Sequence, residues 1–457
     1  MSSRSPALIR SGGLGRPSVR AHPAQGIFAG GLAAAAIGTV LLMLPFAKAG
    51  PGSAPWNDAL FTAVSALSIT GLVTVDTGTY WTGFGHAVIL TLIQIGGIGI
   101  MTFASFVGLV VIRRMSFQSR LNAAAETKAV GLHDLKSLVA GVVLTSLVIE
   151  LVVATILTIR FIVDGMAPGA AAWSGIFHGV SSFNSAGFAL ASDSLAAYVH
   201  DPVVSLTVCV AVILGGLGFP VLVQLRKHLL TPRLWTMNTR LVLAMTALIL
   251  PLSAIFITVL EWDNPRTLGA YDPGTRILAG FFQAVQTRSS GFTTVDVGEM
   301  HGATLLGMDA MMFIGAGPAG TGGGIKVTTF GVLLFILIAE IRGDGAVNVF
   351  GKRLSRAVHR QAMAVVLVGV ATVVGSTILI MLITPFDVEH VLFEVISAFA
   401  TVGLSTGITS SLPEGAQVIL CVLMFLGRLG PITFATALAL RRRTILYQLP
   451  KERPIIG

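Results

Sequence analysis

Four short strings of small and polar residues recur along this chain, each between long apolar runs. They are SITGLVTV (68–75), NSAGFALA (184–191), RSSGFTTV (288–295) and ATVGLSTG (400–407). When the strings are aligned on their central glycines, the intervals are 116, 104 and 112 residues. Self-similarity at a nearly constant interval is the signature of a repeated structural unit, so the chain is predicted to contain four copies of one unit.

The repeat extends beyond the four strings. A phenylalanine stands ten residues before each central glycine, and a serine stands six residues before three of the four glycines. A second glycine-bearing signature follows each string: IGGIG (95–99), LGGLG (214–218), IGAGP (314–318) and LGRLG (426–430). We interpret each unit as a membrane span, a short amphipathic segment, a turn of small residues and a second span.

The composition indicates that these units lie in a membrane. Hydrophobic residues make up 54% of the 457 positions and charged residues 11%, whereas soluble domains carry about 25% charged residues. A spanning helix needs about 20 apolar residues, and eight runs approach or exceed that length. They lie near 27–46, 86–112, 137–163, 203–225, 241–261, 303–340, 362–384 and 415–440. The run at 303–340 is too long for one straight helix, and glycines interrupt it.

The distribution of charge predicts the orientation of the chain. The formal net charge is +9, but most Lys and Arg residues fall in 1–26, 113–136, 226–240, 342–360 and 441–453, whereas the intervening connections are acidic. Because basic connections remain in the cytoplasm, both termini are predicted to be cytoplasmic in a multi-pass plasma-membrane protein. A basic rim at the membrane explains the charge better than nucleic-acid binding does, so no nucleic-acid partner is expected.

The four strings predict an ion pathway. A short helix that enters the bilayer halfway must return through irregular backbone, which is tolerated at that depth only when it is buried in protein or lines a wet path. A ring of backbone carbonyls can replace the hydration shell of a cation. The predicted filter residues are Thr70, Gly71, Ala186, Gly187, Ser290, Gly291, Val402 and Gly403. Helix-packing glycines are the alternative for any single string, but four strings in register favour the filter.

The predicted fold class is therefore an all-α integral membrane protein with four pseudo-repeated span–pore loop–span units around one central pore. The predicted segments are a cytoplasmic N-terminal segment (1–26), unit 1 (27–112), unit 2 (113–225), unit 3 (226–340), unit 4 (341–440) and a cytoplasmic C-terminal tail (441–457).

Two features inside the predicted spans suggest a gate. Arg428 stands in the last span where the other units have glycine or alanine, and a charge below the filter would repel cations. The alternative role is structural, with the arginine capping carbonyls of a neighbouring unit. The segment GAGPAGTGGGIK (315–326) cannot form a stable helix and could plug the conduit; a broken helix without a gating role is the alternative. The gate candidates are Gly317, Pro318, Gly320, Thr321, Gly322, Gly323, Gly324, Lys326 and Arg428.

These features together resemble the Trk/Ktr/HKT superfamily of potassium transport proteins over roughly 27–457, and most closely its KtrB branch. The resemblance implies K⁺ as the transported ion and, through Gly71, selectivity for K⁺ over Na⁺; a requirement for Na⁺ stays open. It also implies that 315–326 is the intramembrane gating loop of unit 3 and that Arg428 is a barrier to flow. One implied partner is a second copy of the chain, with the C-terminal tail at the interface between the two copies. The other is a KtrA-type cytosolic ring that binds ATP or ADP.

Other readings remain open. A cation-coupled secondary transporter is the main alternative, although such transporters are usually built from inverted repeats and these repeats share one orientation. No constellation typical of an enzyme is visible in the sequence, so catalysis is not expected.

Glu150 lies in the middle of the run 137–163. Its role is left open between an intramolecular polar partner and a contact with a second copy of the chain.

Overall fold

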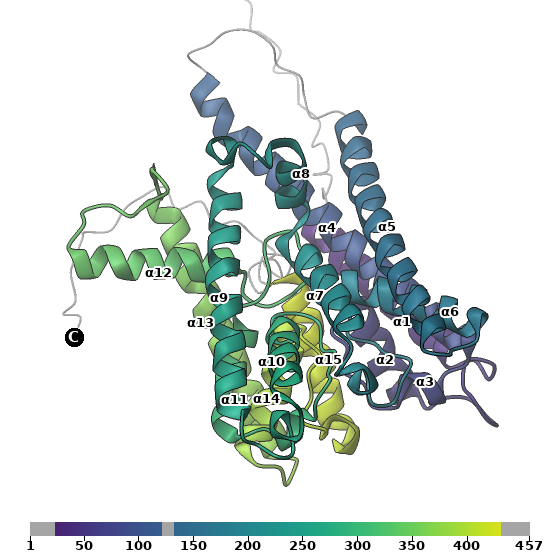
Figure 1. The fold of residues 1–457 in the computed structure, drawn as a ribbon. Helices are drawn as coiled ribbons and strands as arrows, with labels where there is room; N and C mark the ends of the chain where they lie inside the picture. The colour runs from purple at the N-terminus through teal and green to yellow at the C-terminus, as the bar shows by residue number, and fades with distance from the viewer. Residues whose placement is uncertain (1–22, 121–131, 431–457) are drawn as a thin grey trace, which may run out of the picture.

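The computed structural model describes residues 23–120 and 132–430 as an array of helices (Figure 1). The predicted N-terminal segment 1–26 and the predicted basic connection 113–136 lie partly outside these residues, and the predicted C-terminal tail 441–457 lies wholly outside them. The described helices of ten residues or more that do not lead into a glycine string are, in chain order, α1 (Pro23–Leu42), α4 (Gly83–Arg120), α5 (Leu132–Val163), α7 (Pro202–Leu217), α8 (Phe219–His228), α9 (Met237–Glu261), α11 (Gly302–Phe313), α12 (Val327–Arg342), α13 (Arg356–Met381) and α15 (Glu414–Leu429).

Four further helices of 13 to 16 residues, called the short helices below, each precede one of the glycine strings. They are α2 (Trp56–Ser68), α6 (Pro168–Phe183), α10 (Pro273–Thr287) and α14 (Val388–Ala400). At 1.5 Å per residue they are about 20 to 24 Å long, which is longer than the segment from the phenylalanine to the glycine alone, because each begins several residues before its phenylalanine. The order helix, helix that leads into a glycine string, turn, helix thus recurs four times.

Several helices have the length and apolarity of membrane spans. Val139–Val163, Met237–Glu261 and Arg356–Met381 meet both criteria, and α7 with α8 forms a fourth candidate that is bent by 100°. The sequence predicted one run at 203–225, but the chain turns at Gly218, whose φ is +91°. The break expected in 303–340 is confirmed, since α11 ends at Phe313 and α12 begins at Val327. In Figure 1, α12 runs outward across the direction of α9.

The connections add small structured elements. They are a short helix α3 (Thr77–Tyr80) and an antiparallel pair of strands, β1 (Asn348–Val349) and β2 (Lys352–Arg353). Aspartates begin several helices: the Asp201 side chain accepts a hydrogen bond from the Val203 amide at 2.8 Å, and Asp272 accepts one from the Thr275 amide at 3.1 Å. Such caps satisfy amides that have no partner within the helix.

The helices pack so that the four recurring groups meet in cyclic order. α4 packs on α5 and α6, α7 packs on α10, α11 packs on α14, and α15 packs on α2. The last of these contacts joins the C-terminal part of the described chain to its beginning. The largest buried cluster runs across this junction and includes Phe61, Phe177 and Phe393, three of the phenylalanines that stand ten residues before a glycine.

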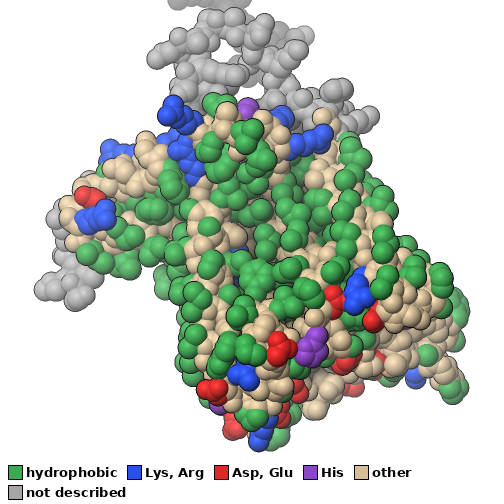
Figure 2. Space-filling model, viewed as in Figure 1, with side chains coloured by type: hydrophobic (Ala, Val, Ile, Leu, Met, Phe, Trp, Pro, Cys, Tyr) green, Lys and Arg blue, Asp and Glu red, His purple; other side chains and the backbone are tan. Residues whose placement is uncertain are grey.

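Charged side chains separate toward the two ends of the molecule. Figure 2 shows most of the visible Lys and Arg near the end that carries α8 and most of the visible Asp and Glu near the opposite end. Arg226 and Lys227 lie in the last turn of α8, whereas Asp272 begins α10 at the other end. This arrangement is the one that the basic and acidic connections of the sequence predict.

Candidate functional site

The four central glycines lie next to one another although the chain separates them by more than 100 residues. A methyl group at any of them would approach a neighbouring carbonyl oxygen to less than 3.0 Å. Those oxygens belong to Ala186 for Gly71, Ser290 for Gly187, Val402 for Gly291 and Thr70 for Gly403. Each glycine therefore faces the residue that precedes the next glycine, and the fourth returns to the first. The structure brings together all eight residues predicted as the filter.

Backbone conformation explains why glycine occupies these positions. The φ angles are +93° at Gly71, +71° at Gly187, +74° at Gly291 and +91° at Gly403, a region that residues with a Cβ adopt only with strain. Three of the short helices lead into a residue that also has positive φ, two positions before the glycine: Ile69, Ser185 and Thr401. The third segment departs from this pattern at Ser289.

The serine that stands six residues before a central glycine forms hydrogen bonds that hold the loops. Ser65 Oγ accepts from the Gly71 amide and Ser397 Oγ from the Gly403 amide, each at 3.1 Å. Ser181, at the same spacing, instead donates to the Phe188 carbonyl at 2.9 Å. The third unit has valine here and lacks this support. The serine six residues before the glycine is thus a local brace that the alignment alone could locate.

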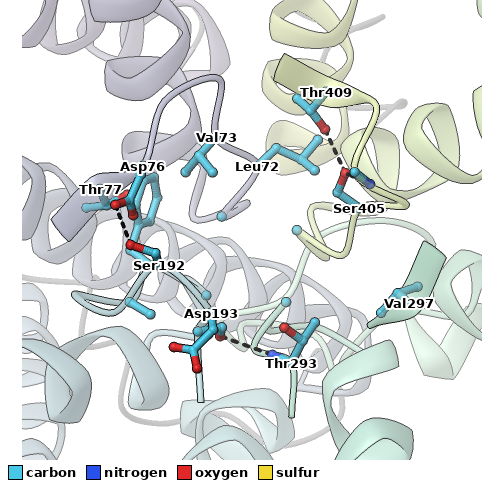
Figure 3. Close-up of a pocket in the computed structure, with 18 of the residues that line it drawn as sticks. Leu72, Val73, Asp76, Thr77, Ser192, Asp193, Thr293, Val297, Ser405 and Thr409 are labelled. Atoms are coloured by element: carbon cyan, nitrogen blue, oxygen red, sulfur yellow. Dashed lines mark hydrogen bonds between the residues drawn. The ribbon is translucent and has the colours of Figure 1, made fainter. Parts of the chain in front are cut away.

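On the acidic end of the molecule, a cavity of 530 Å³ opens above the four glycines and is lined by all of them (Figure 3). Asp76, Asp193 and Asp296 also line it. Asp76 accepts hydrogen bonds from Thr79 at 2.5 Å and from Ser192 at 2.7 Å, so it links two of the loops. Three carboxylates around a cavity attract cations and raise their local concentration.

The Asp76 carboxylate is expected to remain charged in this cavity. Burial alone would raise the pKa of Asp76, but the hydrogen bonds from Thr79 and Ser192 outweigh it and hold the pKa below its ordinary value. A lowered pKa means that the charge is present above the ordinary value and is lost only as the pH falls through the lowered one.

We expect Asp76→Asn to raise the KM for cation uptake by about twofold to threefold, because one attractive charge at a distance of several ångströms in a wet mouth is worth only about 0.5 kcal/mol. The maximal rate should change little, and the difference between the variant and the wild type should be constant from pH 8 to pH 5. Uptake kinetics measured at several external K⁺ concentrations provide the test. An unchanged KM would contradict a role for Asp76 in attracting cations.

The glycine-rich segment 315–326 packs against the residues that precede the central glycines, whereas the cavity is lined by the glycines and the residues that follow them. Thr321 Oγ1 is 2.8 Å from Ser185 Oγ, and the Gly323 amide donates to Thr401 Oγ1 at 2.9 Å. A methyl group on Gly322 would approach the Ser289 side chain to less than 3.0 Å. The segment therefore contacts three of the four residues that stand two positions before a central glycine.

Two backbone hydrogen bonds tie the same segment to the end of α7. The Gly317 amide donates to the Gly216 carbonyl at 2.8 Å and the Thr321 amide to the Gly215 carbonyl at 3.1 Å. Lys326 Nζ donates to the Gly322 carbonyl at 2.6 Å, a bond within the segment itself. The segment is thus held by individual hydrogen bonds to its neighbours and not by a helical ladder of its own.

Arg428 joins this segment to the first unit. Its guanidinium donates to the Thr321 carbonyl and, at 3.0 Å, to the Gly96 carbonyl, and the residue is 7% exposed. These bonds are the contacts that the structural interpretation of Arg428 anticipated. They leave a positive charge beside the glycine-rich segment, so a role as a barrier to cations is compatible with the same geometry.

Two buried polar residues at the site were not recognised as site residues from the sequence. Glu394 on α14 accepts hydrogen bonds from Ser405 at 2.5 Å and from Thr409 at 2.7 Å, and so holds the segment after Gly403. Asn184 lies three residues before Gly187 and is fully buried. The sequence did contain a signal for both residues. Glu394 is a polar residue that breaks the apolar face of a short helix, and Asn184 is a polar residue at the end of a short helix, beside a glycine string.

Comparisons with known proteins agree with this arrangement. The family described as TrkH, cation transport protein, matches residues 20–443. A Ktr system potassium uptake protein B of Bacillus subtilis is 38% identical, over 92% of this chain and 94% of the relative. The potassium/sodium uptake protein NtpJ of Enterococcus hirae is 32% identical, over 96% and 98%. The crystal structure of the potassium transporter TrkH from Vibrio parahaemolyticus superposes with a TM-score of 0.72 at 18% identity and covers 93% of this chain and 87% of that one.

The helices and their composition define a multi-pass membrane protein. The family match spans most of the sequence, and the solved structure has the same fold. The chain belongs to the TrkH family of cation transport proteins. The resemblance to the Trk/Ktr/HKT superfamily that the glycine strings indicated is thereby confirmed.

Proposed function

We propose that this protein is a potassium uptake subunit in which four pseudo-repeated units surround one pore. The observation that carries the proposal is the closed cycle in which each central glycine faces the carbonyl of the residue before the next one. Backbone carbonyls that converge on an axis can replace the water around a dehydrated monovalent cation. The name of the Bacillus subtilis relative supports potassium as that cation.

Under this proposal the filter consists of the four central glycines and the residues that precede them. Positive φ angles at the glycines leave successive carbonyls free to point in one direction. The short helices direct their carboxyl ends, where the helix dipole is negative, toward the same place. The acidic cavity lies on one side of the four glycines and the glycine-rich segment on the other, as a mouth and a gate would.

The gate in this proposal is formed by 315–326 and Arg428. The segment could block the path below the filter, and the bond from Arg428 to the Thr321 carbonyl would hold it there. Opening then requires the segment to leave Ser185 and Thr401, which are its hydrogen-bonding partners at the filter. The guanidinium charge would add an electrostatic barrier until it moves.

Partners and orientation follow from the same proposal. Basic residues at the end that carries α8 indicate that this end is cytoplasmic, with both termini on that side of the plasma membrane. A KtrA-type ring that binds ATP or ADP would dock there and control the gate, and two copies of the chain would form a homodimer. The relative named as part of a Ktr system supports a protein that works with other components.

Whether potassium moves alone is a separate question. The name of the Enterococcus hirae relative includes sodium, so a cation-coupled transporter is the second candidate. The four recurring groups have the same element order and meet in cyclic order, whereas coupled transporters commonly place a midplane site between inverted repeats. This difference favours a channel-like pathway.

Purified protein in liposomes tests the proposal. We expect K⁺ or Rb⁺ uptake down a gradient without Na⁺ in the medium, and an increase when the cytosolic ring and ATP are added. Uptake that occurs only with Na⁺ on the same side would favour the coupled transporter. The absence of cation uptake from protein that is folded and complete with its ring would contradict the proposed function.

A further inference from the structure

A buried carboxylate lies inside the membrane-spanning part of the protein. Glu150 is on α5, within the span Val139–Val163, and is 4% exposed. Both of its oxygens are occupied: Oε2 accepts from Gln94 Nε2 at 2.8 Å, and Oε1 accepts from Asn184 Nδ2 at 3.0 Å. Ionisable residues at such positions are rare in membrane proteins and commonly functional, so this cluster needs an explanation that packing alone does not supply.

The cluster ends at the second filter segment. Asn184 stands at the C-terminus of α6, and its Nδ2 also lies 3.0 Å from Gln94 Oε1 and from the Val180 carbonyl of its own helix, so its two N–H groups are shared among three acceptors. The next residue, Ser185, contacts Thr321 of the glycine-rich segment. The residue after that, Ala186, presents the carbonyl that faces Gly71. The Asn184 amide therefore joins α4 and α5 to a carbonyl of the predicted filter across only two residues.

The other three units do not repeat this arrangement. Three positions before the central glycine they have Ser68, Arg288 and Ala400. The Ser68 hydroxyl donates to the Val64 carbonyl within its own helix at 2.6 Å. The Nε atom of Arg288 has no partner among the described residues. The second segment is thus the one that is tied at this position to two spans by a carboxylate and two amides.

We propose that Glu150 is a positioning and specificity-determining residue, which acts through Asn184 to hold the Ala186 carbonyl at the distance that suits K⁺. The inference rests on the proposed function. A filter whose carbonyls resist moving inward holds a cavity that fits K⁺ better than the smaller Na⁺. Asn184, held by Glu150 and Gln94, opposes that movement in the second segment. Glu150 itself touches no ion.

The hydrogen-bond pattern supplies a sharp test because it is symmetric. Asn184 donates to both Gln94 and Glu150, and the glutamine donates to the carboxylate. Exchanging the two residues, as Gln94→Glu with Glu150→Gln, keeps the same donors and acceptors. Each single change breaks the pattern, since Glu150→Gln places two amide groups against each other and Gln94→Glu places two carboxylates together.

We expect each single variant to lower the ratio of K⁺ to Na⁺ uptake by about tenfold, as follows when a buried donor or acceptor loses its partner. The KM for K⁺ should rise more than the maximal rate falls. The double exchange should restore the ratio to within about threefold of the wild type. Leu151→Ala, on the adjacent and 68% exposed position of the same helix, is the matched control and should change neither quantity.

Uptake of K⁺ and of Na⁺ by the full-length protein in liposomes, normalised to the amount of reconstituted protein, distinguishes the outcomes. If the wild type carries no cation, the proposed function fails. If the wild type transports and the single variants keep its selectivity, the positioning role of Glu150 is wrong. Loss of selectivity in the double exchange at normal protein level would also overturn it, because the restored hydrogen bonds would then have no effect. This last comparison remains decisive if a single variant does not fold.

Discussion

Replacing Gly71 with serine is expected to remove most of the discrimination between K⁺ and Na⁺. A Cβ at this position would approach the Ala186 carbonyl to less than 3.0 Å, and the backbone φ of +93° is one that serine adopts only with strain. The strain is worth about 1 to 3 kcal/mol, and the clash must displace a carbonyl of the proposed filter. We therefore expect the K⁺ to Na⁺ selectivity ratio to fall by about tenfold or more, measured as competitive uptake in liposomes.

Gly50→Ser provides the matched control for this prediction. Gly50 has a nearly identical φ of +91°, and a Cβ there would meet nothing within 4 Å. This variant carries the backbone strain without the clash, so its stability can fall while its selectivity stays as in the wild type. Unchanged selectivity in Gly71→Ser, at a normal level of protein, would count against the assignment of the filter.

The second large effect is expected at Arg428. Arg428→Ala removes a buried positive charge and both hydrogen bonds that join the Thr321 and Gly96 carbonyls. With the barrier and the anchor of the glycine-rich segment both lost, cation flux should increase by about tenfold or more, since a charge near the pathway changes an ion's energy by more than 1 kcal/mol. Flux of Rb⁺ at saturating concentration is the appropriate measurement.

Arg428→Lys separates the two contributions. Lysine keeps the charge but lacks the planar fork that reaches two carbonyls at once. If electrostatic repulsion limits the flux, this variant should remain as slow as the wild type. If anchoring of the segment limits it, Arg428→Lys should be as fast as Arg428→Ala. A decrease of flux in Arg428→Ala with normal membrane expression would show that the residue supports the structure and does not restrain flow.

Much of the local structure could be predicted from residue type and spacing. The recurrence of a glycine-bearing string between apolar runs predicted the irregular turn at each string, and five glycines with Pro318 predicted the break between α11 and α12. The serine six residues before the glycine recurred often enough to be noticed before its bonds to Gly71 and Gly403 were known. In each case the signal acts within one turn or one helix, where a single residue's steric freedom or hydrogen-bonding group decides the conformation.

The bend at Gly218 shows where this kind of prediction fails. A continuous apolar run at 203–225 favoured one straight helix, because hydropathy reports only burial or contact with lipid. The chain turns by 100° there, and the Phe219 amide beyond the bend donates to the Ala319 carbonyl of the glycine-rich segment at 3.2 Å. A contact with a segment about one hundred residues away thus outweighs the preference for a continuous helix.

By itself the sequence determined that this is a membrane protein of repeated helical units, and that four glycines stand where backbone with positive φ is required. Those properties depend on the apolar content of each run, on the nearly constant interval between the glycine strings and on the lack of a Cβ at the glycines. Each of these can be read from the sequence without knowing which residues meet in space. The tertiary structure decided which carbonyl each glycine faces, which acceptors Arg428 finds and which of the four glycine strings Glu150 contacts, through Asn184. The Arg428 and Gly96 pair is 332 residues apart, and only closure of the first unit on the last, through packing of α15 on α2, brings such groups together.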